Sequence, residues 1–442
     1  MRANAPGAGR RAAGHATDPC AVARTLQNTL LALASIAFTV SLMECGLRLR
    51  DYGSIVRVSG EHVLRFPDPV RGWILLPGRT AFQRTRDYGI TVTINDKGLR
   101  DRPHEYTPAP GVFRIVVLGD SFMEAYQVTL EESLPHRLQE RLAARGVEVV
   151  NLGVGGYGTI QAYLALREEG LRYQPDLVIL AFFSNDVSDD SRALQELRLG
   201  PDDLKTFGRP FVRIAGDDAE IEWVMPDPDR VERYVAKRRA KRSGALRAVL
   251  RFLEPTQVGN AFERGLSALL PRAVKHHDPH VILGWPFLSD FSPEFASPKL
   301  DRSRYDEVWE DAWRITRRMI LETQRLARSA GAEFVILYVP TPVQVDPEYR
   351  RRVEREFPGL PFDHTRLNRE LARFSAEHGI PLFDPLDAFI AENSQRLLFH
   401  QFEDRHWNAD GHEVATRELV RFLDREALIP PGASGGPSPG EL

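Results

Sequence analysis

One serine in this chain lies where a nucleophile would be needed. Ser121 follows the apolar run 113–118 through Gly119 and Asp120, and the glycine permits a tight turn that presents the serine hydroxyl at a strand end. The motif is not the Gly-x-Ser-x-Gly elbow of α/β-hydrolases, because Met123 occupies the place of the second glycine. Asp120 and Ser121 are also a common pair at a helix start, so the run taken alone has a purely structural alternative.

Two further runs offer donors for the negatively charged oxygen that forms when a serine attacks an ester. Residues 151–158, NLGVGGYG, hold enough glycines to indicate positive φ or a close approach to another group. A phosphate-binding loop is the rival interpretation, but no acidic residue follows at the next strand end to hold a ribose. The amide of Asn185, in Asn185-Asp186, can donate to an oxyanion, although this pair is also ordinary turn chemistry.

A histidine near the C-terminal end is the candidate general base. Asp404 precedes His406 by two residues, and a carboxylate so placed can fix the imidazole tautomer and stabilise its charged form. His406, Asp410 and His412 suggest metal ligation as an alternative, but their spacing matches no familiar motif and no third ligand is evident. The mechanism that these residues indicate needs neither a metal nor an organic cofactor.

Apolar runs predict the sheet that positions these residues. Buried strands are indicated at 113–118, 147–150, 176–182, 334–339 and 380–383. Apolar residues at helical spacing lie between them, and the stripe before the fourth strand runs from Val308 to Leu326. Alternating strands and helices form a parallel sheet with helices on both faces, and such sheets bind ligands at the carboxyl ends of their strands. The candidate residues fall at those ends.

The four runs together resemble the four blocks of the SGNH/GDSL hydrolase superfamily. The resemblance implies a flavodoxin-like three-layer α/β/α sandwich in which Ser121 is the nucleophile and His406 the base. It implies an oxyanion hole formed by the backbone N–H groups of Ser121 and Gly156 and the side chain of Asn185. The commonest form of the last block would place the acid at Glu403, and a shorter Asp-x-His-Trp form places it at Asp404. We predict Asp404, with Glu403 and Asp120 as supporting residues.

Composition and the same resemblance divide the chain. Leu26 to Met43 carry no charge and are roughly the 17–25 residues that cross a bilayer, so we predict an uncleaved anchor; a signal peptide is the alternative. Arginines flank both ends of this segment, so the distribution of charge does not determine its orientation in the membrane. The resemblance to membrane-anchored relatives implies that the catalytic domain lies outside the cytoplasmic membrane, in the periplasm. The predicted parts are a disordered 1–24, an anchor 25–47, a β-rich lead-in 51–110, a hydrolase domain 111–428 with an insertion 188–305, and a disordered tail 429–442.

The expected activity is that of a serine esterase acting on an acylated glycan or a small ester outside the cytoplasm. An O-acyltransferase that moves the acyl group to a polysaccharide hydroxyl is the first alternative, and a non-catalytic glycan-binding or assembly protein is the second. The net charge of -3 gives no pull toward nucleic acid. The basic run 237–242 is either a solvated helix face or a contact with an anionic membrane.

Overall fold

The computed structural model describes residues 64–85, 87–214, 220–241, 302–356, 363–401 and 404–431, together with six positions between Asn28 and Thr39. The chain divides into two compact units, Met1–Ile55 with Arg242–Ala273, and Val56–Lys241 with Val274–Leu442. Only the six isolated positions belong to the first unit.

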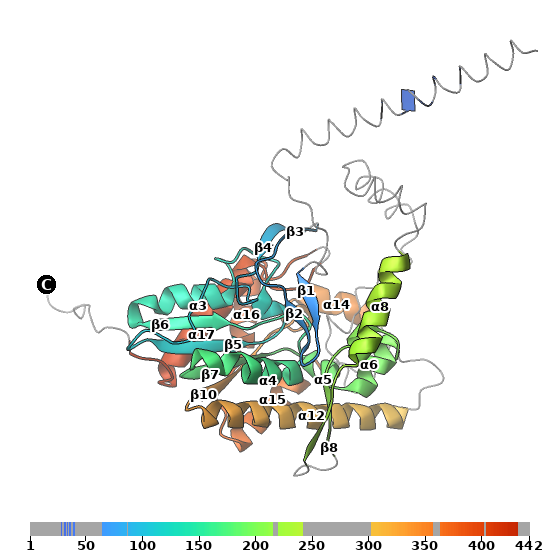
Figure 1. Cartoon of the computed structure of the whole chain (residues 1–442). Coiled ribbons are helices and arrows are strands. Elements are labelled where there is room, and N and C mark those ends of the chain that lie inside the picture. The colour runs from blue at the N-terminus through green and yellow to red at the C-terminus, as the bar shows by residue number, and fades with distance from the viewer. Residues whose placement is uncertain are drawn as a thin grey trace, which may run out of the picture. The chain divides into compact units, whose positions relative to one another are not determined.

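A five-stranded parallel sheet forms the centre of the second unit (Figure 1). Its strands in spatial order are β11 (Leu382–Phe383), β10 (Glu333–Tyr338), β7 (Leu177–Phe182), β5 (Phe113–Leu118) and β6 (Val147–Asn151). In chain order this is 2-1-3-4-5, the flavodoxin-like order, whose ligand site lies where the first and third strands adjoin. The predicted parallel sheet is confirmed, and each strand lies within a few residues of its expected position.

The two faces of the sheet bury different side chains of the same strand. In β5, Ile115 and Val117 join one apolar cluster, whereas Val116 and Leu118 join the other, because successive residues of a strand point to opposite faces. The first cluster takes residues from α3 (Leu134–Leu142), α16 (Leu386–Asn393) and α17 (Ala409–Arg425). The second takes residues from α4 (Thr159–Glu168), α12 (Arg302–Ser329) and α15 (Arg366–Glu377). The predicted three layers follow from this division.

Two short hairpins precede the sheet along the chain. They pair β1 (Arg65–Asp68) with β2 (Gly72–Leu75), and β3 (Thr80–Arg84) with β4 (Gly89–Thr93). The remaining described elements are short except for one helix: α2 (Ser121–Glu124), η2 (Ala143–Arg145), η3 (Gly170–Tyr173), α5 (Asp186–Asp189), α6 (Arg192–Leu199), α7 (Leu204–Phe207), β8 (Phe211–Ile214), β9 (Ile221–Val224), α8 (Pro228–Lys241), α13 (Pro342–Val345) and α14 (Pro347–Glu356).

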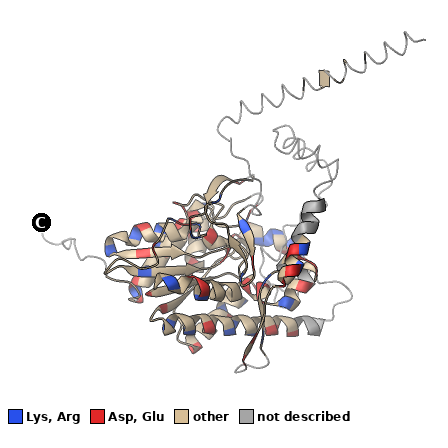
Figure 2. Ribbon diagram, viewed as in Figure 1, with Lys and Arg blue, Asp and Glu red and all other residues tan. Residues whose placement is uncertain are grey.

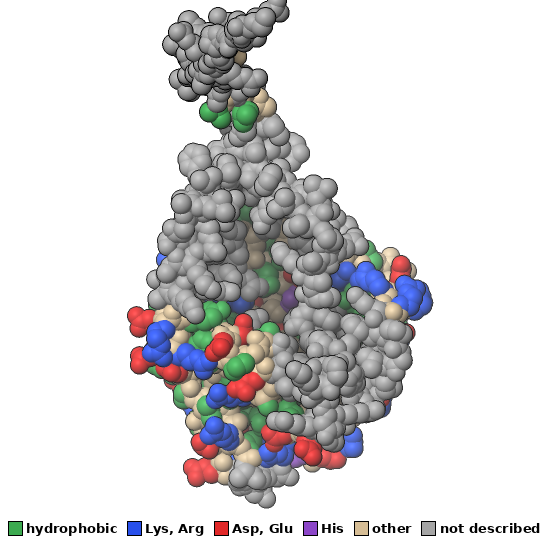
Figure 3. Space-filling model, turned by 90° about the vertical axis from the view of Figure 1, so that its right-hand side faces the viewer, with side chains coloured by type: hydrophobic (Ala, Val, Ile, Leu, Met, Phe, Trp, Pro, Cys, Tyr) green, Lys and Arg blue, Asp and Glu red, His purple; other side chains and the backbone are tan. Residues whose placement is uncertain are grey.

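The predicted membrane anchor, 25–47, lies almost wholly outside the described residues. No helix within the described part of the chain is long and apolar enough to cross a membrane. Most of the predicted insertion, the predicted disordered start 1–24 and residues 432–442 of the predicted tail also fall outside that part. Residues 429–431, the start of the predicted tail, are described, and Ile429 is buried in the core. Acidic and basic side chains intermingle over the described ribbon and over the face in Figure 3, without a large patch of one sign (Figures 2 and 3).

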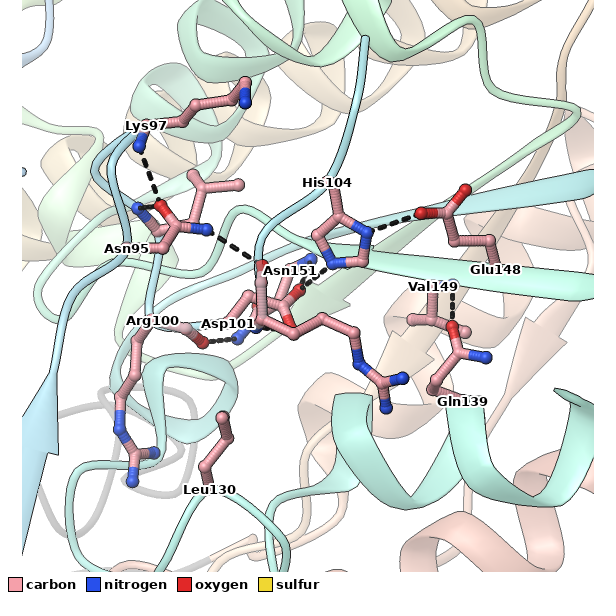
Figure 4. Close-up of polar contacts among 12 residues, drawn as sticks. Asn95, Lys97, Arg100, Asp101, His104, Leu130, Gln139, Glu148, Val149 and Asn151 are labelled. Atoms are coloured by element: carbon pink, nitrogen blue, oxygen red, sulfur yellow. Dashed lines mark hydrogen bonds and ion pairs between the residues drawn. The ribbon is translucent and has the colours of Figure 1, made fainter. Parts of the chain in front are cut away.

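A buried polar network joins the segment after the second hairpin to strand β6 (Figure 4). The ring of His104 contacts Asp101 Oδ2 at 3.1 Å through Nε2 and Glu148 Oε1 at 2.6 Å through Nδ1. Asp101 Oδ2 also accepts the N–H of Asn151 at 2.8 Å. Burial by itself would lower the pKa of His104, but the two carboxylates outweigh it and raise that pKa above 6.5.

We therefore expect the protein to lose stability as the pH rises through neutrality. A histidine whose folded pKa exceeds its unfolded value contributes stability that is complete below the unfolded pKa and is lost as pH rises through the folded pKa. Urea unfolding between about pH 5.5 and pH 9 should show a larger fall in unfolding free energy for wild type than for His104→Gln. Parallel profiles for the two proteins would contradict the expectation.

Candidate active site

Ser121 begins the four-residue helix α2, directly after strand β5. Asp120 precedes it as the N-cap and accepts the N–H of Phe122 at 2.9 Å, so the structural role foreseen for Asp120 is present beside the serine. Ser121 is half-buried, whereas the six residues after it are buried. The turn thus exposes the hydroxyl-bearing position and packs the others into the core.

A buried arginine holds the far end of this turn. Ala125 caps α2 with φ 53°, a left-handed conformation that residues other than glycine seldom adopt. Arg100 donates to the carbonyls of Glu124, Ala125 and Val128 at 2.5–2.6 Å. Burial lowers the pKa of Arg100 to about 10, and its guanidinium stays charged at neutral pH. This cation connects the segment before the sheet to the turn that begins with Ser121.

His406 stands between Ser121 and Asp404. Its Nε2 lies 2.7 Å from Ser121 Oγ, and its Nδ1 lies 2.5 Å from Asp404 Oδ1. Asp404 Oδ1 also accepts the backbone N–H of His406 at 2.8 Å, which fixes the side chain against its own loop. The structure therefore brings together the three residues that the sequence suggested as nucleophile, base and acid.

The carboxylate of Asp404 is held in its ionised form. Burial alone would raise its pKa, but the charge and hydrogen bonds of His406 outweigh burial and lower the pKa below its usual range. Tyr88, at the start of the β3–β4 hairpin's second arm, donates its hydroxyl to Asp404 Oδ2 at 3.1 Å. Glu403, the alternative acid, lies outside the described residues.

The β3–β4 hairpin also supports the backbone of the histidine loop. Asp87, in its connecting turn, accepts the N–H of Gln401 at 2.8 Å and the N–H of Asp404 at 2.9 Å. The ring of Tyr88 lies 5.2 Å from the ring of His400. Sequence reasoning missed Asp87 and Tyr88, because a turn more than 300 residues away carries no local sign of the loop that it supports.

We expect Asp87→Ala to lower kcat for ester hydrolysis by about 10- to 100-fold, because small displacements of a catalytic group are costly. The variant removes the acceptor of two N–H groups in the histidine loop. Asp96→Ala is the matched control, since Asp96 belongs to the same lead-in and forms an ion pair with the neighbouring Lys97 at 3.6 Å. Steady-state kinetics on the two variants check this, and equal rates would contradict it.

The glycine loop packs directly against the serine turn. Asn151 donates its side-chain amide to Met123 O at 2.8 Å, and Glu124 Oε2 accepts the N–H of Gly155 at 2.5 Å. A Cβ on Gly153 would lie 2.4 Å from the Cβ of Met123, so only glycine allows this approach. These contacts bring the loop that contains Gly156 beside the turn that begins with Ser121.

Two backbone N–H groups remain without an acceptor in these segments. Leu152, Gly153, Val154, Gly155 and Tyr157 all donate their N–H groups within the described structure, whereas the N–H of Gly156 does not. Phe122, Met123, Glu124 and Ala125 likewise donate, and the N–H of Ser121 does not. Gly156 is half-buried, whereas the residues on either side of it are buried. Ser121 and Gly156 are the two residues suggested as backbone oxyanion donors.

Asn185 follows strand β7 and is almost fully buried. Its Nδ2 donates to Asp189 Oδ2 at 3.2 Å, which leaves the second amide hydrogen available. Several carboxylates surround it. Burial raises the pKa of Asp120 to about 6 and of Asp190 to about 7, and raises that of Asp186 well above its ordinary value. Ionised carboxylates near a developing oxyanion would oppose it, and burial shifts these toward the neutral form.

The alternative metal ligands point to other partners. His412 is buried and accepts the N–H of Leu134 at its Nδ1, and burial lowers its pKa well below the usual value. Asp410 forms an ion pair with Arg396 at 2.9 Å. Within the described ranges, no group of three or more histidine, cysteine or acidic residues is placed to hold a metal ion.

Residues 117–307 match the model of the GDSL-like Lipase/Acylhydrolase family. The match covers less than half of the chain and includes Ser121, Gly156 and Asn185, whereas Asp404 and His406 lie beyond it. It supports an ester-hydrolysing enzyme of the GDSL/SGNH type. No curated protein matches the chain.

Solved structures give weaker likenesses. An esterase, EstA, from Pseudoalteromonas sp. is 12% identical, with 71% of this chain and 98% of that chain covered and a TM-score of 0.32. An acetyl xylan esterase is 13% identical, with coverages of 70% and 98% and a TM-score of 0.32. A member of the lipolytic G-D-S-L family from Veillonella parvula is 12% identical, with coverages of 71% and 100% and a TM-score of 0.32. At these scores they carry no argument about the reaction.

Proposed function

We propose that this protein is a serine esterase of the GDSL/SGNH type that removes O-acetyl or other short acyl groups from a glycan outside the cytoplasm. The observation that carries the proposal is the continuous contact from Ser121 Oγ through His406 to Asp404, at 2.7 Å and 2.5 Å. An alcohol, an imidazole and a carboxylate in that order are the requirement for acyl transfer through a covalent serine ester. The family match over residues 117–307 supports the ester as substrate.

The proposed reaction starts with attack by Ser121 on the ester carbonyl. His406 accepts the hydroxyl proton at Nε2 and then gives it to the leaving alcohol, while Asp404 stabilises the imidazolium. The N–H groups of Ser121 and Gly156 and the side chain of Asn185 hold the oxyanion, and each donor of this kind lowers the barrier by about 2.7–4 kcal/mol. A water activated by His406 then releases the acyl group and regenerates the serine.

The glycan and the location are the less direct parts of the proposal. They rest on the uncharged segment from Leu26 to Met43 and on the resemblance to membrane-anchored relatives. An enzyme anchored with its catalytic domain in the periplasm would have acylated polysaccharides within reach. The molecule that accepts the acyl group from the serine distinguishes the proposed esterase from the alternative O-acyltransferase. Water is the acceptor in an esterase, and a sugar hydroxyl is the acceptor in an O-acyltransferase.

The test uses the full-length protein in detergent. A fluorophosphonate probe should label one residue, which peptide mass mapping should identify as Ser121, and an O-acetylated polysaccharide should release free acetate. Loss of acetyl groups to an added glycan, without free acetate, would replace the esterase by the acyltransferase. Glycan binding without labelling or turnover would contradict both enzymes and leave the binding protein.

A further inference from the structure

We infer that Trp73 and Arg209 are positioning residues that lock the oxyanion turn, so that the N–H of Gly156 faces the reacting carbonyl. This inference rests on the proposed function and extends it to two parts of the chain outside the central sheet. Trp73 lies on β2 of the first hairpin, and Arg209 lies between α7 and β8. Neither residue belongs to the four sequence runs, around Ser121, Asn151, Asn185 and His406, from which the catalytic residues were predicted.

The turn that presents Gly156 has two available forms. Tyr157 donates its N–H to Val154 O at 3.0 Å, and Gly156, the third residue, has φ +78°, which is the type II geometry. Types I and II differ chiefly in the orientation of the central peptide, here the one joining Gly155 to Gly156. Glycine accepts both signs of φ, so sequence alone leaves this peptide free to rotate. In the other form, the carbonyl of Gly155 would replace the N–H of Gly156.

Trp73 holds the peptide in the donating orientation. Its indole Nε1 donates to Gly155 O at 3.2 Å. The carbonyl of Gly155 and the N–H of Gly156 belong to one planar trans unit and point in opposite directions, so fixing one fixes the other. The indole ring also blocks the space over Gly156, where an added Cβ would lie 3.3 Å from Trp73 Cζ2.

Arg209 holds the peptide that joins Gly156 to Tyr157 and links it to Asn185, the third proposed oxyanion donor. Its guanidinium donates to Gly156 O at 2.9 Å and to Asp189 O at 2.7 Å, and lies 3.3 Å from Asp189 Oδ1. Asp189 accepts the side-chain amide of Asn185. The side chain of Arg209 is 1% exposed, so its bonds are protected from water. One buried cation therefore connects the Gly156 loop with Asn185.

The two positioning residues also support each other. The guanidinium of Arg209 lies 5.2 Å from the Trp73 ring centroid, within the range of a cation–π contact. Beside them, a Cβ on Gly72 would lie 2.5 Å from Gly208 O, so the hairpin and the segment before β8 touch at a place that only glycine permits. Both peptides flanking the Cα of Gly156 are thus fixed by side chains that contact each other.

The decisive experiment removes the indole N–H and little else. Substitution of Trp73 by benzothienylalanine keeps the two-ring shape without the N–H, and Trp73→Phe is the simpler companion. Trp223→Phe is the matched control, because Trp223 lies 5.7 Å from the ring of Tyr163 and 5.4 Å from the guanidinium of Arg167, as Trp73 contacts Tyr157 and Arg209. All are measured in the full-length protein with an acetyl ester and with a trifluoromethyl ketone, whose serine adduct carries an oxyanion.

We expect the Trp73 variants to lose kcat by about 10- to 100-fold with KM within about twofold, because the competent turn becomes a minor form. Affinity for the trifluoromethyl ketone should fall by the same factor, and Trp223→Phe should leave both unchanged. Arg209→Met should repeat the pattern, and its effect should shrink in an Asn185→Ala background. Unchanged kcat and ketone affinity in the benzothienylalanine protein would overturn the inference while Ser121-dependent turnover by wild type stands. Absence of that turnover would overturn the proposed function itself, and the inference with it.

Discussion

Replacing His406 by alanine is expected to lower kcat for ester hydrolysis by about 10⁶-fold. Ser121 Oγ lies 2.7 Å from His406 Nε2, and without the imidazole its proton has only water to accept it. Since the two residues act as one unit, the double variant Ser121→Ala, His406→Ala should be no slower than either single variant. Initial rates with an activated acetyl ester would measure all three.

His378 provides a control that distinguishes the loss of the proposed base from the loss of an aromatic contact. The ring of His406 lies 4.5 Å from the ring of Phe122, and the ring of His378, the residue that caps the C-terminal end of α15, lies 4.6 Å from the ring of the buried Phe374. His378→Ala therefore removes a comparable aromatic contact away from the site and should keep wild-type kcat. A His406→Ala protein that retained more than a hundredth of wild-type kcat would remove the histidine from the proposed mechanism.

Asp404→Asn is expected to lower kcat by about 10⁴-fold while the fold remains intact. An asparagine of the same shape can donate to Nδ1 of His406, which selects the imidazole tautomer that cannot take the proton of Ser121. The 2.5 Å contact between Asp404 Oδ1 and His406 Nδ1 makes this the acid that the geometry favours. The variant's kcat should be measured across pH, because a wrong tautomer persists at every pH where the imidazole is neutral.

Glu403→Gln decides between the two neighbouring acids. If Asp404 orients the base, Glu403→Gln should change kcat less than about twofold, because the carboxylate that contacts His406 is still present. A loss of about 10⁴-fold in Glu403→Gln, with an active Asp404→Asn, would move the acid to Glu403 and contradict the assignment made from the contact distances.

The sequence predicted the parts of this molecule that depend on short-range pattern. Continuous apolar runs such as 113–118 and 334–339 are a local property of strands buried on both faces between two helix layers, so the strands lay close to where they were expected. The placement of Ser121 and Asn185 after the neighbouring strands β5 and β7 was also predictable, because a parallel sheet gathers its carboxyl ends at one edge. His406 follows no strand of the sheet and reaches the same edge from the loop before α17.

What the sequence did not reveal depends on contacts between distant segments. Asp87, Trp73 and Arg209 each stabilise a loop of the site from 53 to more than 300 residues away. Nothing in their own neighbourhoods differs from ordinary turn or surface residues, and the hydrogen bonds that give them importance exist only after folding. The glycines of residues 151–158 indicated a constrained backbone, but they did not indicate which side chains constrain it.

The separation of Ser121 and His406 along the chain sets a delay between the synthesis of the proposed nucleophile and the synthesis of its proposed base. The two residues are 285 positions apart, which is roughly 15–60 s of synthesis at the usual 5–20 residues per second. In the proposed mechanism the serine is an ordinary alcohol during that time, because the histidine that would activate it has not yet been synthesised. A chain that ended between Phe383 and His406 would hold all five strands of the central sheet without the proposed base, so the proposed reactivity arises only after the sheet has been synthesised.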